Sequence, residues 1–187
     1  MATVTTPMTV EEFLALPDDG TERWVIDGDL REKRMTKRNR FHSRCMSCTT
    51  TQFENWHQQR PQPRGQILCG EAGLILQRDP LIVFGVDVLV VSAELLAQQT
   101  DNCTVIEGVP SLIAEILSPN DTVEEVHEKI DAFMAAGVPQ VWILDPYDRT
   151  VIVYRPGREP EFANILQELS GEPELPGFKV PVARLFD

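Results

Sequence analysis

Two apolar runs stand out in the pattern of hydrophobic and polar positions along the chain. Residues 81–91 and 112–117 are rich in valine, isoleucine and leucine, and each run contains one carboxylate, Asp87 in the first and Glu115 in the second. Such composition predicts buried strands. A carboxylate in a buried strand costs roughly several kcal/mol unless it is paired, hydrogen-bonded or bound to a metal ion. We therefore expect both carboxylates to have a partner or a chemical role.

A helical period follows the second run. The apolar residues that recur with this spacing are Val123, Val126, Ile130, Phe133 and Met134. The sequence predicts that Asn120 or Asp121 caps the start of the helix and that Gly137 ends it. At about 100° per residue, Lys129 lies on the flank of the apolar stripe. It can bury its stem and carry its amine toward the strand end where Glu115 lies.

Shorter patterns predict the remaining elements. We expect helices over 11–16, 39–59 and 92–99, a hairpin of 23–26 with 29–31 around Asp27-Gly28, strands over 66–69, 73–76, 141–144 and 151–155, and a surface segment over 156–176. This order predicts an α/β fold with a mixed central sheet flanked by helices, in a single domain over 1–187. The antiparallel hairpins argue against a purely parallel, doubly wound sheet.

Composition and cysteine content narrow the class of protein. The chain has 187 residues, 42% of them hydrophobic and 25% charged, which is typical of a soluble globular domain. No apolar run approaches the roughly 20 residues of a membrane helix, and no secretory signal is visible, so a cytoplasmic location is the default. Cys45 and Cys48 form a lone CxxC, and Cys69 and Cys103 are isolated. A zinc site would need two further ligands, so free thiols are the favoured interpretation.

The charge is distributed unevenly. The net charge of −12 argues against a general nucleic-acid coat protein, because such proteins bind phosphate through an excess of Lys and Arg. Seven of the 17 basic residues nevertheless lie in one short segment: Arg31, Lys33, Arg34, Lys37, Arg38, Arg40 and Arg44. This segment is either a basic patch that steers DNA toward one face or simply a solvated, charged loop and helix start.

The order of these residues resembles a known family. Asp87, then Glu115 within AEILSP, then Lys129 within HEKIDAF resembles the PD-(D/E)XK nuclease superfamily and, more closely, its Uma-two family of restriction-type endonucleases. In that family the lysine expected two residues after the glutamate is absent, and a lysine on the following helix substitutes for it. Here Leu117 stands at the regular position and Lys129 on the helix. The segments MTVEEFLALP, VIDGDL, AGVPQVWILDP and LPGFKVPVARLF also match, so the resemblance covers nearly the whole chain.

The resemblance implies a restriction-endonuclease-like core and a metal-dependent endonuclease, with DNA as the partner and substrate. Asp87, Glu115 and Lys129 would be the catalytic residues, and Mg²⁺ or Mn²⁺ would be held by Asp87, Glu115 and the backbone carbonyl of Ile116. Lys33, Arg34, Lys37, Arg38 and Arg40 are the candidates for nucleic-acid contact. A homodimer is common in the superfamily, because two sites are needed to cut two strands.

Each catalytic candidate has a structural alternative. Backbone N–H groups could satisfy Asp87, an arginine could pair with Glu115, and Lys129 could form an ordinary helical ion pair with Glu125. The chain also departs from the family pattern, since Trp24 stands near a usual glutamate position, Val86 replaces a usual proline, and Asn120-Asp121 replace Ser-Thr. Glu22, two positions from Trp24, is a candidate auxiliary acid.

Two further points remain open at this stage. His42 is a candidate auxiliary group near phosphate, although a surface histidine is the simpler interpretation. The alternative function, from another class, is a catalytically silent nuclease-fold protein that binds nucleic acid or a protein partner through the basic segment.

Overall fold

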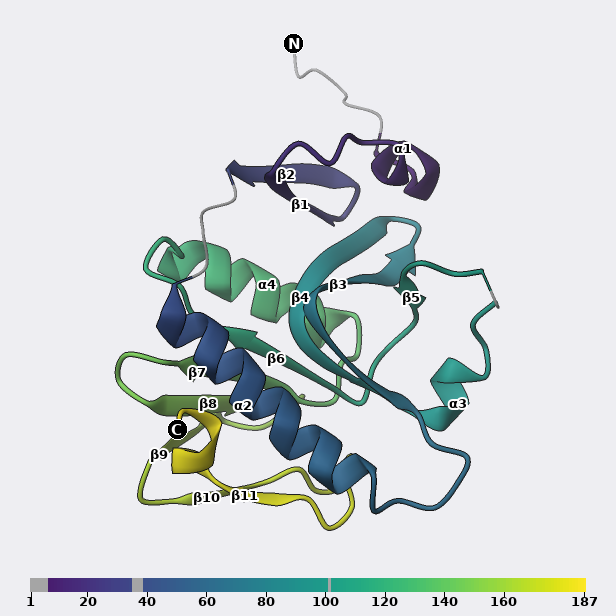
Figure 1. Cartoon of the computed structure of the whole chain (residues 1–187). Helices are drawn as coiled ribbons and strands as arrows, with labels where there is room; N and C mark the ends of the chain where they lie inside the picture. The colour runs from purple at the N-terminus through teal and green to yellow at the C-terminus, as the bar shows by residue number, and fades with distance from the viewer. Residues whose placement is uncertain (1–6, 35–38, 101) are drawn as a thin grey trace.

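A mixed β-sheet forms the centre of the molecule (Figure 1). The computed structural model describes residues 7–34, 39–100 and 102–187. In this part of the chain the main sheet has nine strands, in the order β2-β1-β4-β6-β7-β8-β9, with β3 paired to β4 and β5 paired to β3. Its strands are β1 (Thr21–Ile26), β2 (Asp29–Arg34), β3 (Gln66–Arg78), β4 (Leu81–Val91), β5 (Ile106–Glu107), β6 (Leu112–Ile116), β7 (Val141–Asp145), β8 (Thr150–Tyr154) and β9 (Glu161–Asn164). A small second sheet pairs β10 (Glu168–Ser170) with β11 (Lys179–Pro181).

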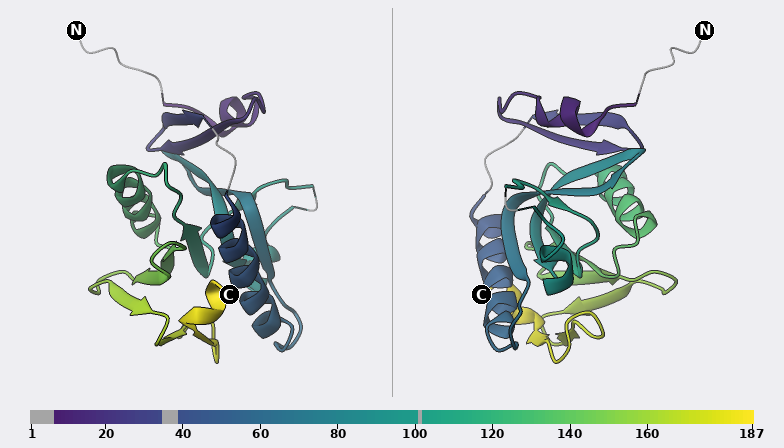
Figure 2. Two further views of the ribbon diagram at one scale, coloured as in Figure 1. Left: turned by 60° about the vertical axis from the view of Figure 1, so that its left-hand side comes forward. Right: turned by 90° about the vertical axis from the view of Figure 1, so that its right-hand side faces the viewer.

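Two long helices cover opposite faces of the main sheet (Figure 2). They are α2 (Arg40–His57) and α4 (Val123–Ala135), and the shorter helices are α1 (Val10–Leu14), α3 (Ala93–Leu96) and the 3₁₀ helix η1 (Val182–Leu185). Strands β6 and β7 run parallel, with α4 as the crossover between them, and the short β5 runs parallel to β3; the other strand pairs described are antiparallel. The predicted mixed α/β fold with flanking helices is therefore confirmed. None of the helices described is both long and apolar enough to cross a membrane.

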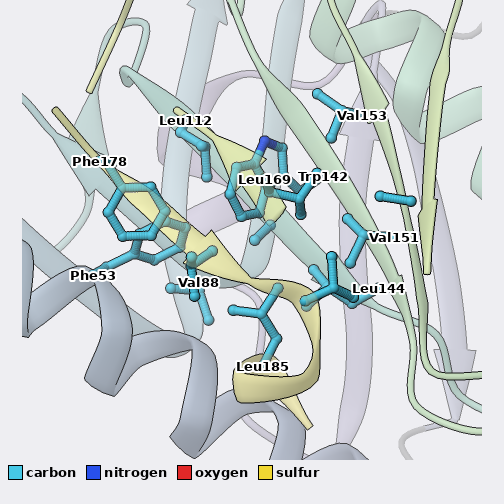
Figure 3. Packing of buried hydrophobic residues seen from close by; sticks show 14 of the residues in the cluster. Phe53, Val88, Leu112, Trp142, Leu144, Val151, Val153, Leu169, Phe178 and Leu185 are labelled. Carbon is cyan, nitrogen blue, oxygen red and sulfur yellow. The ribbon is translucent and has the colours of Figure 1, made fainter. Parts of the chain in front are cut away.

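Strands β6 and β7 alternate between the two faces of the sheet. In β6, Leu112 and Ala114 pack in the cluster that contains Phe53 of α2, whereas Ile113 packs in the cluster that contains Phe133 of α4. Figure 3 shows the first cluster, in which Trp142 of β7 lies close to Phe53. Since successive side chains of a strand point to opposite faces, this alternation fixes the register of the strands against both helices.

The alternation breaks at one place in β4. Val86 packs on the α4 face and Val88 on the α2 face, although residues two apart in a regular strand share a face. Asp87 lies between them. Opposite this point, β3 carries a bulge, because its register with β4 shifts between Cys69 and Ala72. Bulges bend a strand and re-aim its side chains, and here the irregularity coincides with the one carboxylate of β4.

Several expectations about local structure are confirmed. The hairpin turn Asp27-Gly28 has φ angles of 53° and 81°, as a type I′ turn requires. Gly137 follows α4 with φ 87°, as expected for the residue that ends a helix. The cysteines are all free, as the sequence favoured, with Cys45 and Cys48 buried in α2.

Other expectations were wrong. Thr122, and not Asn120 or Asp121, caps α4, because its side chain accepts from the backbone N–H of Glu125 in a capping box. The strands predicted over 66–69 and 73–76 are one strand, β3, made continuous by its bulge. The segment 156–176 does not merely wrap the surface, because β9 extends the main sheet beside β8 and β10 pairs with β11.

Candidate active site

A small cavity lies between the β1–β2 hairpin, the end of β6 and the first half of α4. Its volume is about 30 Å³, which leaves room for at least one water molecule. Glu115 lines it from β6, Lys129 from α4, and Glu22, Trp24 and Lys33 from the hairpin. Three segments that are remote in sequence thus bring two lysines and several carboxylates together around one space.

Lys129 occupies the centre of this arrangement. Its Nζ lies 3.4 Å from Oε1 of Glu22 and 5.2 Å from the centre of the Trp24 ring. Burial lowers the pKa of Lys129, but the negative charges of Glu115 and Glu22 outweigh burial and hold the pKa above its ordinary value. The predicted approach of Lys129 to Glu115 is therefore found. The helical ion pair with Glu125 is not, since Glu125 binds Lys33 instead.

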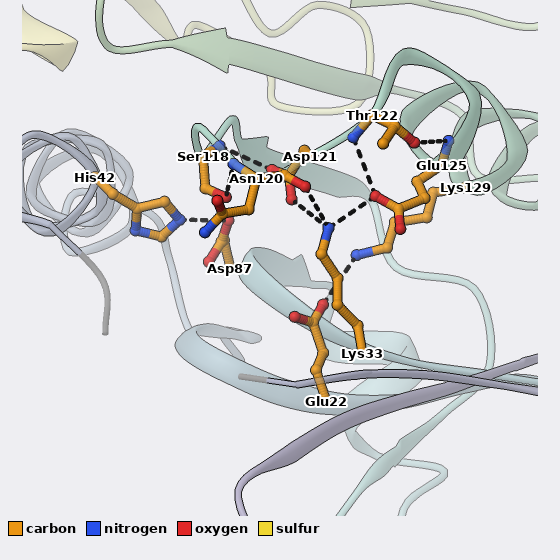
Figure 4. Close-up of polar contacts among 10 residues, drawn as sticks. All are labelled: Glu22, Lys33, His42, Asp87, Ser118, Asn120, Asp121, Thr122, Glu125 and Lys129. Carbon is orange, nitrogen blue, oxygen red and sulfur yellow. Dashed lines mark hydrogen bonds and ion pairs between the residues drawn. The ribbon is translucent and has the colours of Figure 1, made fainter. Parts of the chain in front are cut away.

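Lys33 reaches across from β2 to the start of α4 (Figure 4). Its Nζ donates to the carbonyl of Asn120 at 2.8 Å, to Oδ1 of Asp121 at 3.2 Å and to Oε2 of Glu125 at 2.7 Å. Burial lowers the pKa of Lys33, but the hydrogen bonds to Glu125 and Asp121 raise it above its ordinary value. The same contact lowers the pKa of Glu125. These contacts hold the β1–β2 hairpin against the start of α4, beside the cavity.

Asp87 lies outside the lining of the cavity, at the point where the pairing of β4 with β6 ends. The last paired residues of these strands are Val88 and Ala114, so Asp87 is beyond the ladder. Its Oδ2 accepts the backbone N–H of Ile116 at 2.9 Å and lies 3.2 Å from Nε2 of His42. The N–H of Ile116 belongs to the peptide that joins Glu115 to Ile116, so the Asp87 carboxylate is within one peptide unit of Glu115.

The two carboxylates nevertheless have different surroundings. Glu115 lines the cavity on the α4 side, whereas Asp87 points toward α2, where the fully buried ring of His42 meets it. The backbone N–H group expected as the structural alternative for Asp87 is present, but it occupies only one oxygen. Oδ1 of Asp87 is buried, and no described residue hydrogen-bonds to it. A buried carboxylate oxygen of this kind needs a partner, which a cation or a water molecule can supply.

This orphaned oxygen is the main observation that bears on a metal ion. Carboxylate and carbonyl oxygens are the hard ligands that Mg²⁺ and Mn²⁺ prefer, and Asp87, Glu115 and the Ile116 carbonyl offer that chemistry at one strand end. No group of three or more His, Cys, Asp and Glu side chains that could hold an ion occurs within the described ranges. The donor chemistry of Asp87, Glu115 and the Ile116 carbonyl suits such an ion, with water as the remaining ligand.

The structure also places the auxiliary candidates. Glu22 lines the cavity and contacts Lys129, so the displaced acid does reach the region. The interpretation of His42 as a surface residue was wrong, because its ring is 0% exposed and contacts Asp87. The resemblance had marked His42 as a candidate auxiliary group, but its burial was not predicted, since a buried partner 45 positions away leaves no local signal.

As far as the structure describes the basic segment, its side chains do not all face solvent together. Arg31 pairs with Glu128 and Lys33 with Asp121 and Glu125, so both are bound to carboxylates of this chain. Arg34 and Arg40 are exposed, whereas Lys37 and Arg38 lie outside the described residues. Asp121 and Glu125 were missed as members of the region, although the Thr122-x-x-Glu125 capping box is readable from the sequence and places Glu125 in the first turn of α4.

Comparisons with known proteins extend these observations. The family model Uma2, described as "Putative restriction endonuclease", matches residues 10–183. A crystal structure of a protein from Anabaena variabilis ATCC 29413, described as "a putative nuclease belonging to DUF820", is similar with a TM-score of 0.79 and 23% sequence identity. The similarity covers 96% of this chain and 98% of that one. At this identity the likeness concerns the fold alone. None of the curated proteins matches the chain.

Proposed function

We propose that this nuclease hydrolyses phosphodiester bonds of DNA with the help of Mg²⁺ or Mn²⁺. The chain belongs to the Uma2 family of restriction-endonuclease type, and the proposal proceeds from that membership. Membership in the family confirms the resemblance indicated by the sequence and supports a nuclease. DNA as the substrate, and metal dependence, are the proposal. The single observation that carries it is the buried, unpartnered Oδ1 of Asp87 within one peptide unit of Glu115 in the described structure.

Asp87, Glu115 and the carbonyl of Ile116 would hold the ion. A bound ion supplies positive charge that offsets the charge of the scissile phosphate and makes a water molecule more acidic. His42 and the N–H of Ile116 fix the Asp87 carboxylate in one orientation, since both contact its Oδ2. Orientation of this kind restricts the carboxylate to the geometry in which its other oxygen stays available.

Lys129 would act on the phosphate or the attacking water. Its raised pKa keeps the ammonium charged at neutral pH, so it serves as a hydrogen-bond donor and a positive charge, not as a base. Glu22 lies 3.4 Å from the ammonium and holds it over the cavity beside Trp24. The water oxygen would form a bond to phosphorus in line with the leaving oxygen, whose own bond to phosphorus breaks. The water would give up one proton and the leaving oxygen would take one up, which leaves a phosphomonoester end and a hydroxyl end.

The test is cleavage of supercoiled plasmid in the presence of Mn²⁺. We expect nicking by the native chain and its loss in Glu115→Gln and in Lys129→Met. Two exposed positions provide matched controls, Glu124→Gln on α4 and Lys179→Met on β11, and both should cut as the native chain does. Nicking that persists in Glu115→Gln would refute the assignment of this residue.

A catalytically silent protein gives a different result in the same experiment. In that case native protein shifts the plasmid in a gel without cutting it, and Mn²⁺ does not raise the melting temperature. An ion held at the site stabilises the folded state, and the stabilisation grows with the logarithm of the free ion concentration once that exceeds the dissociation constant. We also propose a homodimer as the form that cuts both strands, which light scattering during size-exclusion chromatography would detect.

A further inference from the structure

A pair of exposed aromatic rings lies on the α2 side of the sheet. The rings of Phe41 and Tyr147 are 5.6 Å apart at an angle of 57°, and their residues are 44% and 49% exposed. Exposed aromatic residues that contact each other on a surface are unusual, because burial of their rings would be favourable. The pair belongs to neither of the two helix-packed hydrophobic clusters.

The first turn of α2 connects this aromatic pair with the candidate active site. Asn39 caps α2 by accepting the backbone N–H groups of Phe41 and His42, at 2.9 and 3.1 Å. Its Nδ2 donates to the hydroxyl of Tyr147 at 2.6 Å. Within one turn of α2, His42 therefore points inward to Asp87 while Phe41 points outward to Tyr147.

Tyr147 lies at the same edge of the sheet as the carboxylates. Ile116, at the end of β6, pairs with Leu144 of β7, and the turn after β7 carries Tyr147. Asp145 fixes this turn, because its Oδ1 accepts the backbone N–H of Tyr147 at 2.8 Å. The turn thus fixes the aromatic pair at the end of the sheet where Asp87 and Glu115 also lie, on the side that carries α2 and His42.

A cavity and positive charge accompany the rings. The cavity is about 340 Å³, and its lining combines the two rings with Arg44 and Arg149 and with one acidic residue, Asp187. The guanidinium of Arg40 stacks over the Phe41 ring at 4.5 Å. In the described part of the chain Arg40 and Arg44 make no ion pair with a carboxylate, whereas Arg149 pairs with Asp187. On a chain of net charge −12, two available cations beside two rings are complementary to a nucleotide.

We propose that Phe41 and Tyr147 form a stacking platform for an unpaired base of the nucleic-acid substrate, next to the bond to be cut. Bases stack on aromatic rings and on guanidinium planes, and Arg40 and Arg44 would contact the adjoining phosphates. The substrate class is therefore a nucleic acid with a single-stranded or unstacked nucleotide at the site. This inference rests on the proposed function, since it places the base relative to the proposed site.

Binding is measured in the Glu115→Gln background, without added divalent ion, so that no substrate is consumed. The probe is a single-stranded DNA oligonucleotide that contains 2-aminopurine, whose fluorescence is quenched when the base stacks. We expect quenching on binding, and preference for the single strand over a duplex of the same sequence. Phe41→Ala should remove the quenching and weaken binding about 5- to 150-fold, as loss of one base-stacking contact does.

Two variants separate stacking from other effects. Tyr147→Phe keeps the ring and loses only the hydrogen bond to Asn39, so it should retain quenching. Phe162→Ala removes a ring that is 59% exposed on β9 and should bind as the background protein does. Unfolding curves of all variants should coincide, because the altered rings are exposed.

The outcomes distinguish this inference from the proposed function. Equal affinity and quenching in Phe41→Ala would overturn the platform, whether or not the native chain cuts DNA. Ring-dependent quenching by a native chain that cuts no DNA would support the platform and overturn hydrolysis. Tighter binding to the duplex than to the single strand would also overturn the platform.

Discussion

Lys129 and Glu115 should be energetically coupled, and a double-mutant cycle can measure that coupling. Lys129→Met keeps most of the apolar stem and removes the charge. The side chains of Lys129 and Glu22 are only 19% and 18% exposed, so the charge of Glu22, like that of Glu115, is left in a poorly solvated cavity. The expected loss of stability comes from these carboxylates as much as from the lysine itself.

The magnitude follows from the distances. At 3.4 Å and an effective dielectric constant of about 20, one ion pair is worth roughly 5 kcal/mol before the cost of desolvation. Desolvation offsets much of this, while the ring of Trp24 at 5.2 Å adds about 1 kcal/mol. We expect Lys129→Met to lower the free energy of unfolding by about 2–3 kcal/mol. Adding Glu115→Gln should recover about 1–2 kcal/mol, within the range of contacting pairs.

Urea unfolding followed by circular dichroism gives the four free energies of the cycle. Lys179→Met, at an exposed position on β11, is the control and should change stability by less than about 0.5 kcal/mol. Additivity of Lys129→Met and Glu115→Gln within about 0.5 kcal/mol would mean that the two side chains do not share a cavity. The geometry of the candidate site would then be refuted, whatever the activity of the protein.

Two other predictions concern Lys33 and the thiols. Lys33 lowers the pKa of Glu125, so their contact stabilises the fold above the ordinary pKa of 4.5 and is lost as the pH falls through the lower folded value. The stability difference between native protein and Lys33→Met, measured by urea unfolding, should therefore shrink below pH 4.5; a constant difference would contradict the contact. Burial raises the pKa of Cys45 to about 12, whereas Cys69 and Cys103 are exposed. A thiol reagent at pH 8 should thus modify two cysteines quickly in native protein and all four in denaturant, and rapid modification of Cys45 would contradict its burial.

The sequence predicted β4, β6, β7, β8 and the long helices well, because their signals are local. The run around Asp87, the run around Glu115 and the period through Lys129 each fall within one element, and β4, β6 and α4 have nearly the predicted bounds. The flank position of Lys129 followed from helical geometry alone. Its approach to Glu115 then required only that the helix pack on the strand that precedes it.

The surroundings of Asp87 could not be predicted in this way. The direction of its side chain depends on the break in alternation between Val86 and Val88 and on the bulge of the neighbouring strand β3. The residues on both sides of Asp87 are apolar, because both faces of β4 are covered. The sequence therefore shows no alternation of polar and apolar positions from which the direction of the Asp87 side chain could be predicted. The contact with His42 depends in turn on where α2 packs, which is a tertiary property.

Lys33 illustrates a different limit. The sequence grouped it with a basic segment, and the count of charges there was correct. Successive side chains of a strand, however, point in opposite directions. In β2, Lys33 therefore points toward α4, whereas Arg34 is exposed. A cluster of basic residues in sequence is therefore not a cluster on the surface unless the element that carries it keeps them on one face.

The structure explains how Trp24 is accommodated near the position where the family pattern has a glutamate. An acid expected near this position would have met Lys129 from the hairpin, and Glu22 supplies that contact from two residues earlier in the same strand. Residues two apart in a strand share a face, so the shift changes the place of the acid along β1 but not its direction. Trp24 in turn closes the cavity with a buried ring against the ammonium. Glu22 thus gives the cavity a carboxylate beside Lys129, and the buried ring of Trp24 excludes water next to the ammonium, which strengthens the ionic contact between Lys129 and Glu22.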